Sequence, residues 1–317
     1  LLADIPRDAR IGSLSGGQRR RVALAALLAG LASAPALAVN GHYPPGIEGL
    51  GAATAPPEGV YYRGYLLHYD VDRFNDAGGD AVPGRNSGSV TALAHRFIWM
   101  TGQQILGADY GVEAIIPTLD LRFDLDVAGG DRFSDKGVGD VFVGPVILGW
   151  HGERWDATFA AGHWFDTASF DADNPASVGK GYGTTMLTLG GVWHLDADRT
   201  WSLSALSRYE IKGKQDDTGI TPGDSWLLEW GIGHRLANGL ELGLVGYDAW
   251  QLEADRGAPT SDKAERHAVG AEAGYFWPAA GIMLKGAYYH EYDTRAGGLK
   301  GLESEGDALR LQLTKFL

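Results

Sequence analysis

The sequence predicts an all-β chain, a transmembrane antiparallel up-and-down β-barrel of about twelve strands with long extracellular loops and short periplasmic turns. Three observations predict it. The chain ends on an amphipathic strand, glycine and aromatic residues are unusually frequent, and long and short connections alternate along the sequence.

The C-terminal residues alternate between apolar and polar. Leu309, Leu311 and Leu313 fall on one face of a strand, and Arg310 and Gln312 fall on the other. A soluble protein rarely ends on an exposed apolar strand, because its free edge templates aggregation. In a membrane barrel the last strand closes the sheet, with lipid on one face and a polar lumen on the other.

The composition agrees with this class. The 317 residues include 47 Gly, 10 Trp, 13 Tyr and no Cys, and glycine is about twice as frequent as its usual 7%. The mean hydropathy is near neutral, which fits neither a helical membrane protein nor a disordered chain. The absence of cysteine excludes disulfides, thiol catalysis and cysteine-ligated metal.

The N-terminal region contains a predicted signal peptide at residues 19–38. A basic stretch, Arg19–Arg21, precedes an apolar core at 22–32 and an Ala-Leu-Ala end at 36–38. We therefore expect cleavage after Ala38. The core is shorter than the roughly 20 residues that cross a bilayer as a helix.

Residues 8–25, DARIGSLSGGQRRRVALA, resemble the signature segment of ABC-type ATPases. Such ATPases also need a phosphate-binding GxxxxGK[ST] loop. The nearest candidate, Gly179-Lys180-Gly181, lacks both the first glycine and the Ser or Thr. We interpret residues 1–18 as an extension from a fused or mis-started reading frame, and place the mature start near Val39.

The net charge of the chain limits the classes of partner that we expect. The chain has a net charge of −13, and without residues 1–38 it has 22 Lys and Arg against 38 Asp and Glu, a net charge of −16. This acidity argues against nucleic acid. The expected partners are outer-membrane lipid and lipopolysaccharide, the barrel-assembly machinery through the last strand, and a small-molecule solute. The expected location is the cell outer membrane with periplasmic termini.

Residues 39–60 contain two Pro-Pro pairs and several glycines, and predict an irregular leader, periplasmic or folded inward as a plug. The barrel is expected at 61–317. Its strands are predicted at 61–74, 88–101, 109–126, 138–151, 154–167, 181–195, 200–213, 224–236, 239–254, 265–277, 281–293 and 305–317. Long connections follow the odd strands, as at 168–180, and tight turns follow the even ones, as at 237–238. A soluble β-sandwich has no reason to alternate loop length so regularly.

Alternation also predicts faces. In the third strand we expect Leu119, Leu121, Phe123 and Leu125 to meet lipid, and Asp120, Arg122, Asp124 and Asp126 to face inward. Glu113 is out of phase with that set, which predicts a bulge near Pro117. The fourth strand is apolar on both sides and cannot be phased. Interfacial aromatic girdles are expected from Trp155, Trp201, Trp226, Trp277 and Tyr288.

The candidate lumen-lining residues carry both signs of charge. They are Arg96, Glu113, Asp120, Arg122, Glu229, Arg235, Glu241, Lys285, Glu291 and Arg310. A barrel of this size can fill its interior with paired ions, or the same groups can line a solute path. The sequence leaves both interpretations open.

No catalytic, cofactor-binding or metal-binding residues are predicted, and no cofactor is expected. Outer-membrane phospholipases and deacylases use a His and a Ser two residues apart on one strand, and none of the nine histidines has Ser at that spacing. Rossmann, HExxH and GxSxG motifs are also absent. The protein is therefore predicted not to be an enzyme.

Three segments, HYPPGIEG at 42–49, PPEGVY at 56–61 and YDVDRFNDAG at 69–78, resemble the meta-pathway phenol degradation family of outer-membrane proteins. The resemblance runs from about residue 41 to the end. It implies an outer-membrane barrel with a role in the uptake of hydrophobic aromatic compounds, and assigns no substrate-site residue.

Two functions therefore stand side by side. One is a channel or transporter for passive uptake of small hydrophobic or aromatic compounds, and the other is a closed structural or adhesive barrel with acidic surface loops. A continuous aromatic path through the lumen favours the first. A lumen packed solid with paired charges favours the second.

Overall fold

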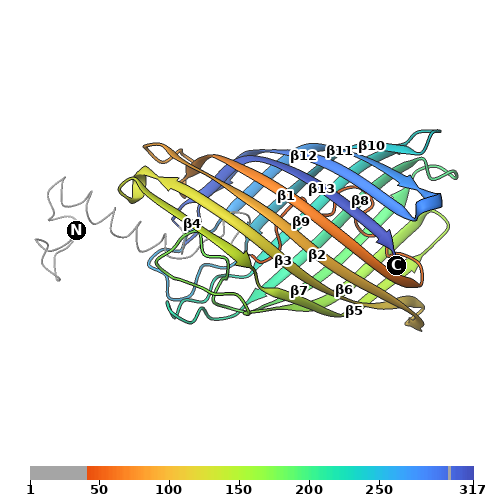
Figure 1. The fold of residues 1–317 in the computed structure, drawn as a ribbon, viewed down its shortest axis with the longest axis horizontal. Coiled ribbons are helices and arrows are strands. Elements are labelled where there is room, and N and C mark those ends of the chain that lie inside the picture. Colours follow the sequence, from red (N-terminus) through yellow and green to blue (C-terminus); the bar gives the residue numbers. More distant parts are fainter. Residues whose placement is uncertain (1–40, 299–300) are drawn as a thin grey trace, which may run out of the picture.

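The computed structural model describes residues 41–298 and 301–317, which form one closed antiparallel barrel of twelve strands with a short extra strand beside β3 (Figure 1). The barrel strands are β1 (Gly59–Asn75), β2 (Asn86–Ile105), β3 (Ala108–Leu125), β5 (Val141–His151), β6 (Trp155–Phe165), β7 (Thr184–His194), β8 (Trp201–Lys212), β9 (Ser225–Arg235), β10 (Leu240–Gln251), β11 (Glu265–Trp277), β12 (Ile282–Arg295) and β13 (Glu303–Phe316). The predicted fold class is confirmed, and each strand lies within a few residues of its predicted position.

The last strand closes the barrel. β13 pairs antiparallel with β12 and with β1, and Leu311 lies opposite Leu66 in the β1 ladder. Leu66 in turn lies opposite Leu93 of β2, and all three leucines are exposed on the outer surface. Arg310, between the outward leucines of β13, is fully buried inside. The alternation of the C-terminal residues therefore separates lipid from lumen as predicted.

The connections distinguish the two ends of the barrel. Long segments such as 166–183, 213–224 and 252–264 lie at one end, which we term the loop end. Short turns such as 152–154, 236–239 and the 3-10 turn η3 (Pro278–Ala280) lie at the other, which we term the turn end. The C-terminus also lies at the turn end (Figure 1).

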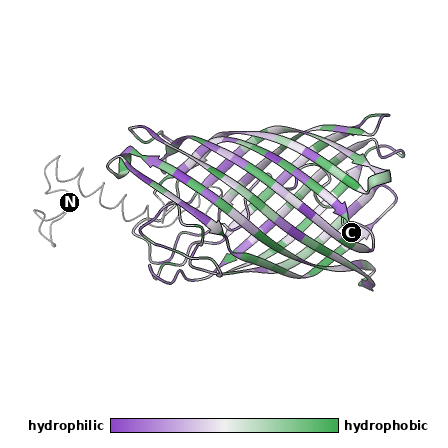
Figure 2. Cartoon of the chain, in the orientation of Figure 1, coloured by the Kyte–Doolittle hydropathy of each residue, from purple (hydrophilic) through white to green (hydrophobic). Residues whose placement is uncertain are grey.

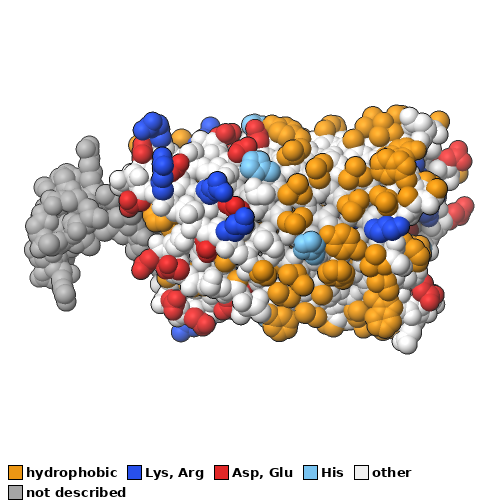
Figure 3. Space-filling model, viewed as in Figure 1, with side chains coloured by type: hydrophobic (Ala, Val, Ile, Leu, Met, Phe, Trp, Pro, Cys, Tyr) orange, Lys and Arg blue, Asp and Glu red, His pale blue; other side chains and the backbone are white. Residues whose placement is uncertain are grey.

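Hydrophobic side chains form a broad belt over the part of the barrel nearer the turn end, while charged side chains gather toward the loop end (Figure 3). Colouring by hydropathy shows hydrophobic and hydrophilic residues alternating along the strands (Figure 2). Trp155, Trp201 and Trp277 are exposed where their strands meet short turns. Such amphipathic rings favour the membrane–water interface.

The second half of β3 differs from the prediction. Leu121, Phe123 and Leu125 are buried in the interior, and Leu119 lines it. The four charged residues predicted to face inward lie at the outer surface, namely Asp120, Arg122, Asp124 and Asp126. This half of β3 extends to the loop end, beyond the belt of Figure 3, so its outer face meets water and its apolar face fills the interior.

An extra strand, β4 (Asp131–Val138), lies beside this half of β3. β4 follows the short 3-10 helix η2 (Asp126–Ala128) and pairs antiparallel with β3 from Leu125 to Thr118. Its sequence, DRFSDKGV, is polar and lies almost entirely between the predicted strands 109–126 and 138–151. The β3–β4 hairpin extends the barrel wall above the membrane-facing belt.

The bulge predicted near Pro117 lies elsewhere. Pro117 pairs with Ala94 in regular register, and Glu113 is in phase with Leu121. The register instead shifts by one residue at Pro145 of β5, in the ladders with both β3 and β6. A bulge reverses the alternation along a strand, which explains why this strand could not be phased from its sequence.

Residues 41–58, which we term the luminal segment, lie inside the barrel and lead to β1 at the turn end. No helix within 41–298 or 301–317 is long and apolar enough to cross a bilayer. The predicted ABC-like extension and signal peptide lie outside the described residues.

Candidate functional site

The luminal segment is irregular, so its buried backbone groups need partners from the barrel wall. Inward-facing carboxylates of β8, β9 and β11 supply partners for its N–H groups. Glu210 of β8 accepts hydrogen bonds from the backbone N–H groups of His42 and Tyr43, at 3.0 and 3.1 Å. Glu229 of β9 accepts from the N–H of Ile47 at 2.8 Å.

The carbonyl groups of the segment are bound by cations of the wall. Arg310 of β13 donates to the carbonyl oxygen of Ile47 at 2.6 Å, and Lys285 of β12 donates to that of Leu50. Both cations also pair with Glu272 of β11, which accepts from the Leu50 N–H. The charged residues on the β8–β13 side therefore act as anchors for the luminal segment.

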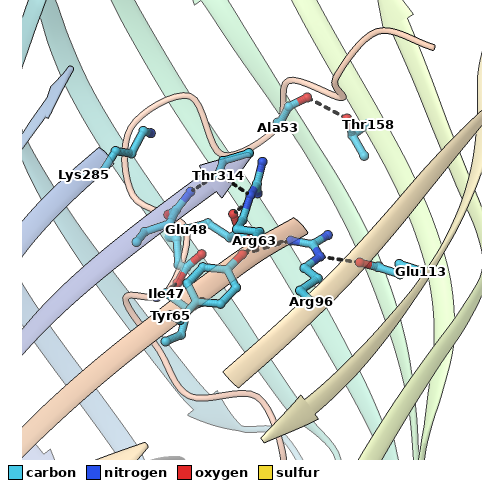
Figure 4. A network of polar contacts seen from close by, with 12 residues as sticks. Ile47, Glu48, Ala53, Arg63, Tyr65, Arg96, Glu113, Thr158, Lys285 and Thr314 are labelled. Atoms are coloured by element: carbon cyan, nitrogen blue, oxygen red, sulfur yellow. Dashed lines mark hydrogen bonds and ion pairs between the residues drawn. The ribbon is translucent and has the colours of Figure 1, made fainter. Parts of the chain in front are cut away.

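Glu48 is the segment's own charged anchor (Figure 4). Its buried carboxylate accepts from Arg63 and from the hydroxyl of Tyr65, both at 2.9 Å, and pairs with Arg96 at 2.5 Å. Arg96 also pairs with Glu113 of β3. Glu48 therefore connects the segment to β1 and β2, opposite the strands that bind its backbone.

A second buried network lies near the loop end. Arg266 of β11 pairs with Glu291 of β12 at 2.6 Å and with Glu303 of β13. Glu291 also accepts from the hydroxyl groups of Tyr69 and Tyr247, at 2.6 and 2.7 Å. This network crosses the ladders of β11, β12 and β13 and fills that side of the interior.

The ten candidate lumen residues therefore fall into three groups. Six are inward-facing and largely buried in the networks above: Arg96, Glu113, Glu229, Lys285, Glu291 and Arg310. Two lie near the turn end: Glu241, which faces inward and is partly exposed, and Arg235, which is exposed at the rim and donates to the carbonyl of Arg199. Asp120 and Arg122 are on the outside and pair with each other at 3.0 Å.

The candidate list omitted several of the residues that hold the interior together. Glu48, Arg63, Glu272 and Arg266 are all buried or nearly so and ion-paired. For Glu272 and Arg266, the alternation of side chains along β11 already indicated an inward position. For Glu48, the only signal was one acidic residue in a glycine- and proline-rich leader.

A cavity of about 140 Å³ remains between the luminal segment and the wall formed by β1–β3 and β5–β8. Its wall side is largely apolar, lined by Ala92, Ala94, Ile115, Pro117, Ile147 and Ala160. The wall also carries Tyr65, Arg63, Arg96 and Glu113, and the two arginines pair with Glu48 of the luminal segment. For comparison, an apolar cavity of about 150 Å³ in another protein holds one benzene molecule.

His42 lines the loop end of this cavity. Its Nε2 lies 3.0 Å from Asp140 and its Nδ1 lies 2.8 Å from the Thr184 hydroxyl. Burial lowers the pKa of His42, and the charge of Lys180 lowers it further, against the opposing hydrogen bond to Asp140. With its proton on Nε2, the ring donates to the carboxylate, and Nδ1 accepts from the Thr184 hydroxyl.

Asp140 holds this end together. Burial alone would raise the pKa of its carboxyl, but hydrogen bonds from His42 and from the backbone N–H groups of Ala168 and Thr167 lower it below the ordinary value. The two backbone bonds are both 2.9 Å. Asp140 thus links the luminal segment to the long β6–β7 connection.

Comparison of the fold with solved structures identifies outer-membrane barrels. The COG4313 outer membrane channel from Pseudomonas putida F1 superposes with a TM-score of 0.73 at 17% identity, covering 84% of this chain and 98% of that one. The beta domain of the Bordetella autotransporter BrkA gives 0.47 at 13% identity, covering 82% and 99%. The first likeness shows that the chain has the fold of an outer-membrane β-barrel.

No curated protein matches the chain in sequence. A family model described as "Putative MetA-pathway of phenol degradation" matches residues 71–301, most of the barrel. The chain belongs to this family.

Proposed function

We propose that the protein is a passive channel for small, neutral, apolar or aromatic molecules, with its turn end and its C-terminus in the periplasm. The cavity beside the luminal segment supports this most directly. It has the size of one aromatic ring, and seven strands contribute to its wall, on which apolar side chains lie beside the paired charges. From Ala92 to Ile98 of β2 its lining follows the wall for roughly 20 Å, at about 3.3 Å per residue.

The charges around the cavity favour neutral solutes. Arg63, Arg96 and Arg208 face Glu48 and Glu113, and these groups are already paired with one another or with Glu229. An ionic solute would lose its hydration without gaining a free counter-charge, which is costly in a buried site. An apolar solute loses little hydration free energy when it enters the cavity.

The other half of the interior favours the closed-barrel alternative. Between the luminal segment and β8–β13, buried ion pairs and backbone contacts fill the space. A channel therefore requires passage on the β1–β7 side, or partial release of the segment. The alternative remains testable because it predicts no protein-dependent flux.

Uptake into proteoliposomes tests the proposal. Phenol and a sugar of similar size would be compared, with empty liposomes correcting for leak through the bilayer. We expect protein-dependent flux of phenol and little of the sugar. Equal flux of both would indicate a general pore, and no added flux of either would overturn the channel in favour of the closed barrel.

A cavity-filling variant makes the test specific. Ala94→Phe places a ring in the cavity and should reduce the phenol flux several-fold. Ala205→Phe is the matched control, because Ala205 is exposed on the outer surface of β8. If both variants transport like the unmodified protein, the solute does not use this cavity.

A further inference from the structure

The outer surface of the barrel changes abruptly from apolar to polar on the face formed by β1–β4 (Figure 3). Leu66 of β1 lies opposite Leu93 of β2. Thr118 of β3 lies opposite Leu93 on one side and Val138 of β4 on the other. The two leucines and Val138 are exposed. This apolar row is part of the hydrophobic belt and forms its border toward the loop end.

Three polar rows follow on the same outer face, at alternate residues of each strand. Residues two apart on a strand are roughly 6.6 Å apart, so the surface becomes charged within that distance of the apolar row. We term these residues the outer polar patch. They are, row by row, His68, Thr91, Asp120 and Lys136; Asp70, Ser89, Arg122 and Ser134; and Ser87, Asp124 and Arg132.

The three cations are the most exposed charged groups of the patch. The side chains of Arg122, Lys136 and Arg132 are 70, 72 and 87% exposed. Their partners are carboxylates of the same patch. Arg122 lies 3.0 Å from Asp120, and Arg132 lies 2.9 Å from Asp124. Exposed ion pairs contribute little to stability, so an anionic ligand can replace the carboxylates as the partner of these cations.

Short hydroxyl side chains lie between the charged residues of β1 and β3. Ser87, Ser89 and Thr91 follow one another on the outer face of β2. The Thr91 hydroxyl lies 2.9 Å from Nδ1 of His68. Hydroxyl and carboxylate groups can bind the hydroxyls of a sugar, whereas Arg and Lys bind phosphate. The patch therefore offers partners for both parts of a phosphorylated sugar, beside a surface suited to acyl chains.

We propose that the outer polar patch binds the headgroup of a phosphorylated glycolipid of the outer leaflet, the chemistry of lipopolysaccharide. The phosphates accept from Arg122, Arg132 and Lys136, the sugar hydroxyls bind the serines and carboxylates, and the acyl chains lie on the apolar row. A simple anionic phospholipid would use the cations and leave most of the other groups without a partner. The proposal rests on the orientation in the proposed function, with the loop end outside, and not on transport.

Lipid titration of the full chain in detergent micelles, read out by native mass spectrometry, tests the site. The probes are bisphosphorylated lipid A, the same lipid without its phosphates, and phosphatidylglycerol. Divalent cations are removed by chelation, because they would bridge carboxylates to phosphates. We expect lipid A to bind about tenfold or more tightly than either of the other lipids, since two or more cations contribute about fivefold each.

Removing the three cations should weaken the binding of lipid A. In the triple variant R122Q/R132Q/K136Q the loss should be about tenfold or more, by the same contribution for each cation. The matched control removes three exposed cations of the long connections, in K214Q/R256Q/K263Q. It should bind lipid A like the unmodified protein.

A substitution that strengthens binding guards against misreading a folding defect. Asp124→Asn removes the carboxylate that pairs with Arg132, so this arginine becomes free for phosphate. We expect lipid A to bind severalfold more tightly to this variant. A misfolded protein could not give that result.

Two results would overturn the proposal: equal binding of lipid A by the triple variant and its control, or equal affinity for lipid A and phosphatidylglycerol. The orientation is tested separately with Asp217→Cys, an exposed loop residue in a chain without cysteine. A bulky maleimide should label it on intact cells. Absence of labelling rejects the orientation, while labelling without lipid selectivity rejects only the glycolipid site. Phenol flux in liposomes without glycolipid tests the channel independently.

Discussion

Glu48→Gln removes the charge that fixes the luminal segment to β1 and β2. The Glu48 carboxylate is buried, with two arginines and a tyrosine hydroxyl bound to it and Arg208 at 3.8 Å. Glutamine keeps one oxygen as an acceptor but cannot balance the guanidinium groups around it. Removing one member of a buried ion pair typically costs about 3–5 kcal/mol, because the remaining charge stays buried.

The substitution therefore destabilises the docked position of the luminal segment relative to its released state. At about 1.4 kcal/mol per factor of ten, the docking equilibrium shifts by roughly two to three and a half powers of ten. The backbone anchors Glu210, Glu229 and Glu272 remain in place. We therefore expect a segment that leaves its docked position more often while the barrel stays closed.

Single-channel recording in planar bilayers measures the consequence. Glu48→Gln should raise the mean conductance or the frequency of openings, and should lower the urea midpoint for unfolding from lipid vesicles. Glu58→Gln is the matched control, since Glu58 is exposed at the other end of the same segment. If the two variants agree in conductance and differ by less than about 0.5 kcal/mol in stability, the Glu48 ion pairs do not hold the segment.

Three further predictions test the faces and the turns. Leu121→Ala should destabilise the barrel by about 2–5 kcal/mol, whereas Arg122→Ala should change stability by less than about 0.5 kcal/mol and leave conductance unaltered; the reverse order in urea unfolding would restore the sequence-predicted phase of β3. Leu66→Arg, on the lipid-facing row, should cost about 2–4 kcal/mol in the same assay, and a loss below 0.5 kcal/mol would place Leu66 outside the hydrocarbon. Hydrogen bonds from the backbone of Trp201 and the hydroxyl of Thr200 lower the pKa of Asp196 from 3.8 to about 2. This carboxylate therefore stabilises its turn fully above pH 3.8 and loses that effect as the pH falls through 2; its ¹³C carboxyl titration should show the low midpoint, Thr200→Val should raise it, and an ordinary midpoint would contradict the turn geometry.

The strands were predictable because each one alternates or is bounded by turn residues, and a barrel strand depends on little else. The outward leucines of β13 and the short turns at the turn end are local patterns of this kind. The prediction of which face of β3 points inward was wrong for a physical reason. Alternation shows which residues share a face, but not whether the opposite face meets lipid or water at that height.

The interior was predictable only in part. The alternation of side chains along the strands marks Glu229, Lys285 and Arg310 as lumen residues. It does not indicate that each binds the backbone of the luminal segment. Glu48 could not be placed at all, because its partners Arg63 and Arg96 become neighbours only when β1 and β2 pair.

The sequence by itself determined the solvent, the strand count and the closure of this barrel. These follow from the period of the side chains and the length of the connections, which are properties of short segments. Only the tertiary structure decided what the lumen contains. Ring closure brings residues more than 200 positions apart into contact, as with Leu50 and Lys285, and the path of the luminal segment leaves one side packed with ion pairs and the other with a ring-sized apolar cavity.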